Sequence, residues 1–232
     1  LENNPQIPVI DHKASFTLGD KIPIDIKAFS IGGNAANVSS ALHKLGINNF
    51  FYTYIGHDAL SQFIEKQLTD EGLKLIVESI DSGDGPLSLI FDFTEDRTIF
   101  SHHPIYNHPF DEAKIIEKPD YIFLTSIGKE WIGAYEKILN YANRENIPIA
   151  SSPGSAQMKD MNETFIKAVH QSKMLLCNME EARRIHEKLS GSQLTNNKEL
   201  LQDLKNYGFD ILSVTDGENG AYAVDRDGKI YK

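Results

Sequence analysis

The sequence is poor in cysteine, in long apolar runs and in basic side chains. Cys177 stands alone among 232 residues, so no intrachain disulfide can form, which favours a reducing compartment and predicts a cytoplasmic location. The first residues, LENNPQIPVID, carry neither the basic start nor the apolar stretch of a signal peptide. No run of eighteen apolar residues occurs, so we expect no membrane-spanning helix.

Basic side chains are outnumbered, with 23 Lys and Arg against 33 Asp and Glu and a formal net charge of −10. An acidic field repels phosphate backbones, so we expect no nucleic-acid partner. A nucleotide is not excluded, because helix N-termini, backbone amides and Mg²⁺ can hold phosphates without a basic surface. Walker A loops, G-x-G-x-x-G fingerprints and G-x-S-x-G elbows are all missing from the sequence.

What the sequence does contain is an alternation of short apolar runs with helical apolar faces. This pattern predicts βα units in one α/β domain, built on a doubly wound, mostly parallel sheet. Asp58 is expected to cap a helix that ends at Gly72. The strands are expected near 49–55, 120–125, 147–150, 173–176 and 210–215, and the helices near 34–46, 58–72, 132–142, 161–171, 178–190 and 197–207.

Two segments, 13–29 and 87–103, break this rhythm with mixed polar and apolar residues of strand character. We predict that they pair in one small inserted sheet, with Glu95-Asp96 as a hairpin turn in the second segment. Such a sheet could act as a lid over a site or as the surface of a homodimer. An edge extension of the main sheet is the alternative.

The segment Ser30–Gly46 places Gly32-Gly33 at the start of a helix. A small polar ligand can approach such a backbone closely, and the helix N-terminus offers free N–H donors. Asn34 and Asn37 lie three residues apart, so both amides can face one ligand, and amides suit sugar hydroxyls. A glycine hinge with Asn34 as a simple N-cap explains the same residues.

Asn178 and Glu181 form an N-x-x-E pattern where a strand gives way to a helix. This spacing is typical of a capping box. The same carboxylate and amide oxygens also suit Mg²⁺, partly through water. The two roles are compatible.

Thr215, Gly217 and Gly220 form a T-x-G-x-x-G loop after a strand. Its exposed amides can make an anion-binding nest, and a glycine turn is the plainer interpretation. Asp216 and Glu218 would put two negative charges close to an anionic ligand, which argues against close phosphate contact by their side chains. Pro153-Gly154 is a softer signal, expected to form a turn after a strand.

Together, the G-G-x-x-x-N start of the first helix, the N-x-x-E pattern and the glycine loop resemble the ribokinase-like (PfkB) kinases of sugars and nucleosides. The resemblance implies that Gly32, Gly33 and Asn37 hold the acceptor. It implies that Asn178 and Glu181 support Mg²⁺ and ATP phosphate. It also places the loop of Thr215, Gly217 and Gly220 beside ATP.

The function expected from this resemblance is ATP-dependent phosphorylation of a hydroxyl group on a small sugar. A nucleoside kinase is the alternative within enzymes, and a non-catalytic sugar-binding or regulatory protein is the alternative outside them. The family's G-x-G-D motif, which supplies the catalytic base, is not found in these residues. We expect that base beyond Lys232, so that residues 1–232 alone would not turn over ATP.

Overall fold

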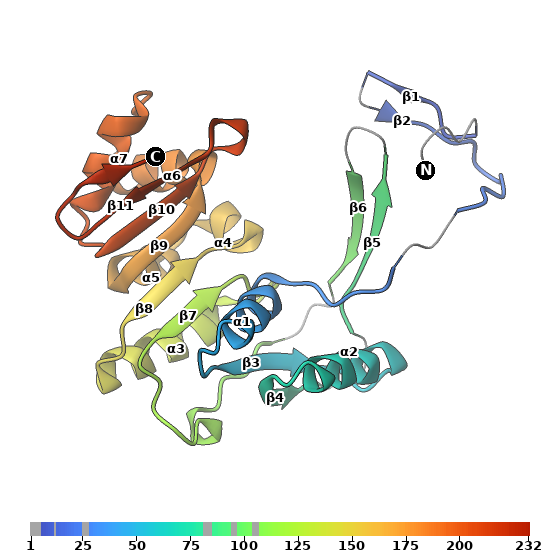
Figure 1. The fold of residues 1–232 in the computed structure, drawn as a ribbon, viewed down its shortest axis with the longest axis horizontal. Helices are drawn as coiled ribbons and strands as arrows, with labels where there is room; N and C mark the ends of the chain where they lie inside the picture. The colour runs from blue at the N-terminus through green and yellow to red at the C-terminus, as the bar shows by residue number, and fades with distance from the viewer. Residues whose placement is uncertain (1–5, 12, 25–27, 81–84, 94–96, 104–106) are drawn as a thin grey trace.

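The computed structural model describes residues 6–11, 13–24, 28–80, 85–93, 97–103 and 107–232. Its largest part is a six-stranded sheet in the order β12-β11-β10-β9-β8-β7 (Figure 1). Neighbours from β7 to β10 are parallel, and β11 and β12 are added antiparallel. The strands are β7 (Ile122–Thr125), β8 (Ile149–Ser152), β9 (Ser172–Asn178), β10 (Ile211–Thr215), β11 (Ala221–Val224) and β12 (Ile230–Tyr231).

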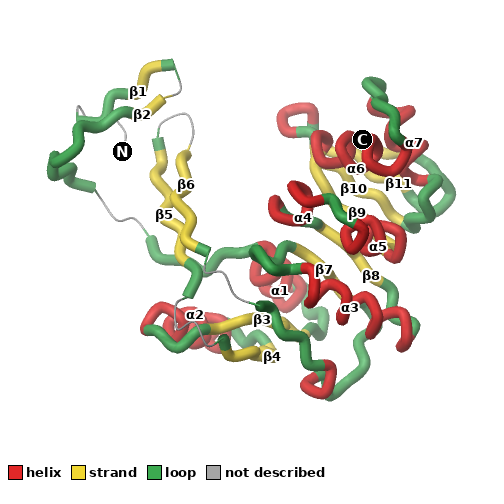
Figure 2. Tube along the Cα trace, turned by 180° about the vertical axis from the view of Figure 1, so that it is seen from behind, coloured by secondary structure: helices red, strands yellow, loops and turns green. Residues whose placement is uncertain are grey.

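The helices that connect these strands gather on one face of the sheet, in front in Figure 2, while α1 lies on the other side beside β7. The apolar faces predicted for them pack into one large core that includes Leu139, Leu175, Ile185 and Leu212, each fully buried. These connecting helices are α3 (Ile132–Glu145), α4 (Ser155–Asp160), α5 (Glu163–Gln171), α6 (Met179–Ser190) and α7 (Asn197–Lys205). The predicted α/β fold with a mostly parallel sheet is confirmed.

A second, smaller unit comes from the N-terminal half of the described chain. Its strands β3 (Phe50–Ile55) and β4 (Lys74–Ser79) are parallel and joined by α2 (Ala59–Asp70), and α1 (Asn34–Lys44) precedes them. Asp58 caps α2 as predicted, since its Oδ1 accepts a hydrogen bond from the Ser61 amide at 2.7 Å. A separate small core packs beneath these elements, built on Ala36, Phe51, Leu68 and Leu73.

The chain between the two units is held by a partly buried polar cluster around Glu78. Lys114, the last residue of the short 3-10 helix η1 (Glu112–Lys114), donates to Glu78 at 2.6 Å and to the Val77 carbonyl at 3.0 Å. Tyr52 donates its hydroxyl hydrogen to Glu78 and accepts from the Asp111 amide at 2.9 Å. Burial favours a neutral Glu78, but the hydrogen bonds from Lys114 and Tyr52 outweigh it and lower the pKa of this carboxyl.

Replacing Lys114 with Met should therefore destabilise the protein by about 1–3 kcal/mol, because Glu78 keeps its charge at 7% exposure with one donor removed. Urea unfolding measures this loss. The matched control Lys66→Met removes an exposed i,i+4 pair with Asp70 and should cost less than about 1 kcal/mol. Since the pKa of Glu78 is lowered on folding, its contribution is present above the unfolded-state pKa and disappears as the pH falls through the folded-state value. Equal losses in both variants would show that the cluster contributes nothing beyond a surface pair.

The inserted segments agree with prediction only in part. Leu87–Asp92 (β5) and Arg97–His102 (β6) form an antiparallel hairpin that stands away from the main sheet. The predicted Glu95-Asp96 turn lies outside the described residues.

The first segment does not pair with this hairpin in the part of the chain that the structure describes. Lys13–Ala14 (β2) instead pairs with Val9–Ile10 (β1), as a separate two-stranded sheet. Gly19 takes φ +94° within a turn closed by the Asp20 amide on the Thr17 carbonyl, and Pro23 has no N–H to offer a ladder. The predicted pairing of 13–29 with 87–103 is therefore wrong for the described residues.

No helix within the described ranges has both the length and the apolar character needed to cross a membrane.

Candidate active site

The parallel register of the main sheet brings four strand ends to one edge. Thr125 at the end of β7 is paired with Ser152 on β8, and Asn178 at the end of β9 is paired with Thr215 on β10. Open α/β sheets bind ligands outside the carboxyl ends of their strands. This edge is therefore where we expect the binding site.

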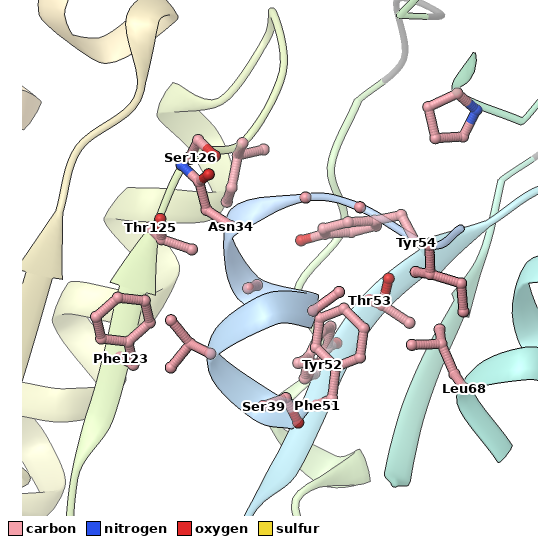
Figure 3. Close-up of a pocket in the computed structure, with 18 of the residues that line it drawn as sticks. Asn34, Ser39, Phe51, Tyr52, Thr53, Tyr54, Leu68, Phe123, Thr125 and Ser126 are labelled. Atoms are coloured by element: carbon pink, nitrogen blue, oxygen red, sulfur yellow. Dashed lines mark hydrogen bonds between the residues drawn. The ribbon is translucent and has the colours of Figure 1, made fainter. Parts of the chain in front are cut away.

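The start of α1 reaches this edge across 92 residues of sequence. The Asn34 side-chain amide donates to Ser126 Oγ at 3.1 Å, and Figure 3 shows the two side chains pointing toward each other beside Thr125. Gly33 precedes the helix at φ +104°, a conformation that a residue with a Cβ rarely adopts. A Cβ at Gly32 would meet no heavy atom within 4 Å, so the backbone here is open to a ligand.

Gly154, after β8, closes the other side of Ser126. A Cβ built on Gly154 would lie 2.2 Å from Ser126 Cβ and 3.0 Å from Ser126 Cα. The fully buried Gln157 fixes this turn, since its Oε1 accepts from the Gly154 amide at 3.2 Å and its Nε2 donates to the Ile127 carbonyl at 2.9 Å. Only a glycine permits this approach of the two strand ends.

One open cavity of about 2140 Å³ includes Gly32, Gly33 and Asn34 together with Ser126 and Gly154. Glu181 also lines it, so the start of α1 and the N-x-x-E carboxylate share a cavity. The cavity continues between β3 and β7, beyond what one small ligand needs. Asn34 and Asn37 are both exposed, but Asn37 is not part of the lining, so the structure does not bring its amide to the same place as that of Asn34.

Asn178 and Glu181 form the capping box that their spacing predicts. The Asn178 amide donates to Glu181 Oε2 at 2.9 Å, and the Glu181 amide donates to Asn178 Oδ1 at 2.8 Å. Burial, and then the charge of Glu181, raise the pKa of the neighbouring Cys177 thiol to about 12. The carboxylate of Glu181 has lone pairs beyond the one used in the cap, so this donor set fits a Mg²⁺ ion that keeps much of its water.

The loop after β10 is closed by its own backbone. The Asp216 amide donates to the Gly220 carbonyl at 2.7 Å, and the short 3-10 turn η2 (Gly217–Asn219) lies between them. Gly217 and Gly220 take φ +53° and +94°, which favours glycine at both positions. Thr215, Gly217 and Gly220 are exposed at the same edge as Asn178.

Among the residues that the structure describes, no group of three or more His, Cys, Asp or Glu side chains could hold a metal by itself. Any cation at this edge would therefore need ligands from water or from a bound phosphate in addition to Glu181 and Asn178.

A family model described as pfkB family carbohydrate kinase matches residues 12–231. The chain belongs to this family. A search of curated proteins finds no match.

Solved structures of pfkB-type kinases share the fold. A ribokinase from Thermotoga maritima superposes with a TM-score of 0.70 at 19% identity, covering 93% of this chain and 69% of its own. An adenosine kinase from Sinorhizobium meliloti gives 0.68 at 14% identity, with 87% and 62% covered. A fructokinase from Xylella fastidiosa, solved with bound ATP, gives 0.65 at 14% identity, with 86% and 66% covered. At these identities the likeness shows the ribokinase-like fold and leaves the substrate open.

Besides the Asn34–Ser126 hydrogen bond, sequence reasoning missed two contacts at this edge: the approach of Gly154 to Ser126 and the attachment of the Asp216 side chain to α7. The Asn197 Nδ2 donates to Asp216 Oδ2 at 3.4 Å. Both contacts join residues far apart in the chain, and no local spacing in the sequence signals them. Pro153-Gly154 was expected only as a turn.

Proposed function

We propose that this pfkB-family protein phosphorylates a hydroxyl group of a small sugar, with ATP as the donor and Mg²⁺ as the cofactor. The observation that carries the proposal is the shared cavity, in which the open Gly32-Gly33 backbone and Asn34 lie with Glu181 at the carboxyl edge of the sheet. Phosphoryl transfer depends chiefly on positioning and charge neutralisation. An acceptor-binding backbone beside a metal-supporting carboxylate meets both needs.

In this proposal each group of residues has one role. Gly32, Gly33 and Asn34 hold the acceptor, Asn178 and Glu181 support Mg²⁺ partly through water, and the loop of Thr215, Gly217 and Gly220 borders ATP. The ATP-bound fructokinase of the same fold supports the choice of nucleotide. No residue of 1–232 is assigned as the catalytic base.

A nucleoside acceptor is the second candidate. The cavity lining includes the aromatic side chains of Tyr54, Phe91 and His103, which could stack on a base. The likeness to an adenosine kinase fold is consistent with such an acceptor.

The proposal includes a cytoplasmic location and a homodimer formed through the β5–β6 hairpin. Buried Cys177 suits a reducing compartment. The hairpin exposes the large apolar side chains of Leu89, Ile90 and Phe100, each about half exposed, and a second copy could cover them. Analytical ultracentrifugation would show the oligomeric state.

The test is a coupled assay for ADP release, using the protein made from its complete coding sequence. A panel of aldoses, ketoses and nucleosides is offered with ATP and Mg²⁺. We expect turnover with at least one member and its loss on chelation of Mg²⁺. Acceptor binding without turnover across the panel would favour the non-catalytic sugar-binding protein.

Glu181→Gln should lower kcat at least about tenfold, as replacing a group that orients a metal usually does. Gln at the third helical position still completes a capping box, so the change tests the carboxylate charge and not the cap. Glu180→Gln, the exposed neighbour on α6, is the matched control and should keep kcat within about twofold. Equal kcat in the two variants would remove Glu181 from the metal site.

A further inference from the structure

The carboxylate of Asp216 stands at the head of the loop assigned to ATP, where a negative charge is unwelcome. In the structure this side chain is not left to solvent. Its Oδ2 accepts from the Nδ2 of Asn197, the first residue of α7, at 3.4 Å. Both side chains are half-buried, so the contact draws Asp216 to the α7 side of the loop.

Asn197 is itself oriented by Arg183 on α6. The Arg183 guanidinium donates to the Asn197 Oδ1, to the Leu194 carbonyl and, at 3.1 Å, to the Thr195 carbonyl. A guanidinium can only donate hydrogen bonds, so the amide oxygen of Asn197 must face Arg183. The amide nitrogen of Asn197 is then free to donate to Asp216. Arg183 thus fixes both the 194–197 segment and the direction of the Asn197 side chain.

Arg183 follows Glu181 by two residues on the same helix. The chain of contacts Arg183–Asn197–Asp216 therefore joins the helix that carries the metal-side carboxylate to the loop on the nucleotide side. The backbone hydrogen bond that closes the loop runs from the Asp216 amide to the Gly220 carbonyl. It therefore starts at Asp216, the residue whose side chain Asn197 holds.

We propose that Arg183 and Asn197 are positioning residues for the nucleotide loop, which they hold through Asp216 at a fixed distance from Glu181. The part of this inference that concerns nucleotide binding by the loop rests on the proposed ATP-dependent function. It assigns Arg183 no contact with substrate. It explains how an acidic residue is accommodated at the head of an anion-binding loop.

The test uses Asn197→Asp in the complete protein. The new carboxylate has the shape of the Asn197 amide and still accepts a hydrogen bond from Arg183. It cannot donate a hydrogen bond to Asp216, and its charge repels the Asp216 carboxylate. Hydrogen exchange of the Asp216, Asn219 and Gly220 amides should become about five- to tenfold faster, the effect of losing one ordinary hydrogen bond. Kd for a fluorescent ATP analogue and KM for ATP should rise by a similar factor while KM for the acceptor stays constant.

The double variant N197D/D216N reverses donor and acceptor and should restore slow exchange and parental Kd. Asn140→Asp is the matched control, since Asn140 is an exposed amide on α3 that accepts from Lys167 on α5; it should leave all four quantities within twofold. Arg183→Lys retains the charge without the planar fork and should speed loop exchange as Asn197→Asp does, which keeps the test available if Asn197→Asp folds poorly.

Unchanged loop exchange in Asn197→Asp and Arg183→Lys overturns the inference, whether or not nucleotide binds. A parental protein that binds no ATP analogue overturns the proposed function and the nucleotide role of the loop. In that case the exchange data still decide whether Arg183 and Asn197 hold the loop through Asp216. A rise in KM for the acceptor equal to that for ATP would show a general loss of structure and also overturn it.

Discussion

Gly154→Ala is expected to lower kcat/KM by about 100-fold, because a methyl group at this position would overlap Ser126. The new Cβ would lie 2.2 Å from Ser126 Cβ and 3.0 Å from its Cα, so backbone and not a flexible side-chain tip must move. Ser126 holds Asn34 through a 3.1 Å hydrogen bond. Displacement of a positioned group by about 1 Å can cost about 10²-fold in rate.

Gly133→Ala is the matched control for this change. Gly133 lies on α3, a Cβ there would meet nothing within 4 Å, and its φ is not positive. This substitution should raise stability by about 0.5–1 kcal/mol, as Gly→Ala in an exposed helix does, and leave kcat/KM unchanged. Steady-state kinetics and urea unfolding of both variants measure the contrast. Normal kinetics in Gly154→Ala would mean that the Ser126 segment yields without disturbing the site.

Alkylation of Cys177 by iodoacetamide at pH 8 should be about a thousandfold slower in the native protein than in the unfolded one. A pKa of about 12 in place of the ordinary 9.0 leaves that much less of the reactive thiolate. Mass spectrometry of the peptide that carries Cys177, with and without concentrated guanidinium chloride, measures the ratio. Steric burial, with 8% exposure, acts in the same direction.

Glu181→Gln supplies the internal comparison for Cys177. The carboxylate charge is the second cause of the raised pKa, after burial, so its removal should speed native alkylation while leaving the reaction far slower than in the unfolded chain. Native alkylation within tenfold of the unfolded rate would show that the end of β9 opens readily to solvent.

Short sequence patterns predicted those strands and helix caps that are determined by residues close together in the chain. Continuous apolar runs predicted β7, β8, β9 and β10 within a few residues, since buried parallel strands need such runs. The Asn178–Glu181 spacing predicted the capping box because both partners lie within one turn.

Features that depend on distant residues were missed or wrong. Strand β4 was not predicted, since it carries the charged Glu78 inward, where Lys114 and Tyr52 make that burial possible. The helical spacing of Asn34 and Asn37 suggested one shared ligand, but Ser126, 92 residues from Asn34, holds only the first amide at the cavity, and Asn37 lies outside its lining.

The capping box at Asn178 has a consequence for ligand binding that goes beyond holding the end of a helix. Ordering a free Glu side chain costs up to about 1.5–2 kcal/mol of rotamer entropy. The hydrogen bond from the Asn178 amide to Glu181 Oε2 means that this cost is met when α6 folds. In the proposed function, a cation that binds Glu181 would meet a carboxylate that is already ordered, and a preorganised ligand of this kind opposes binding with less entropy.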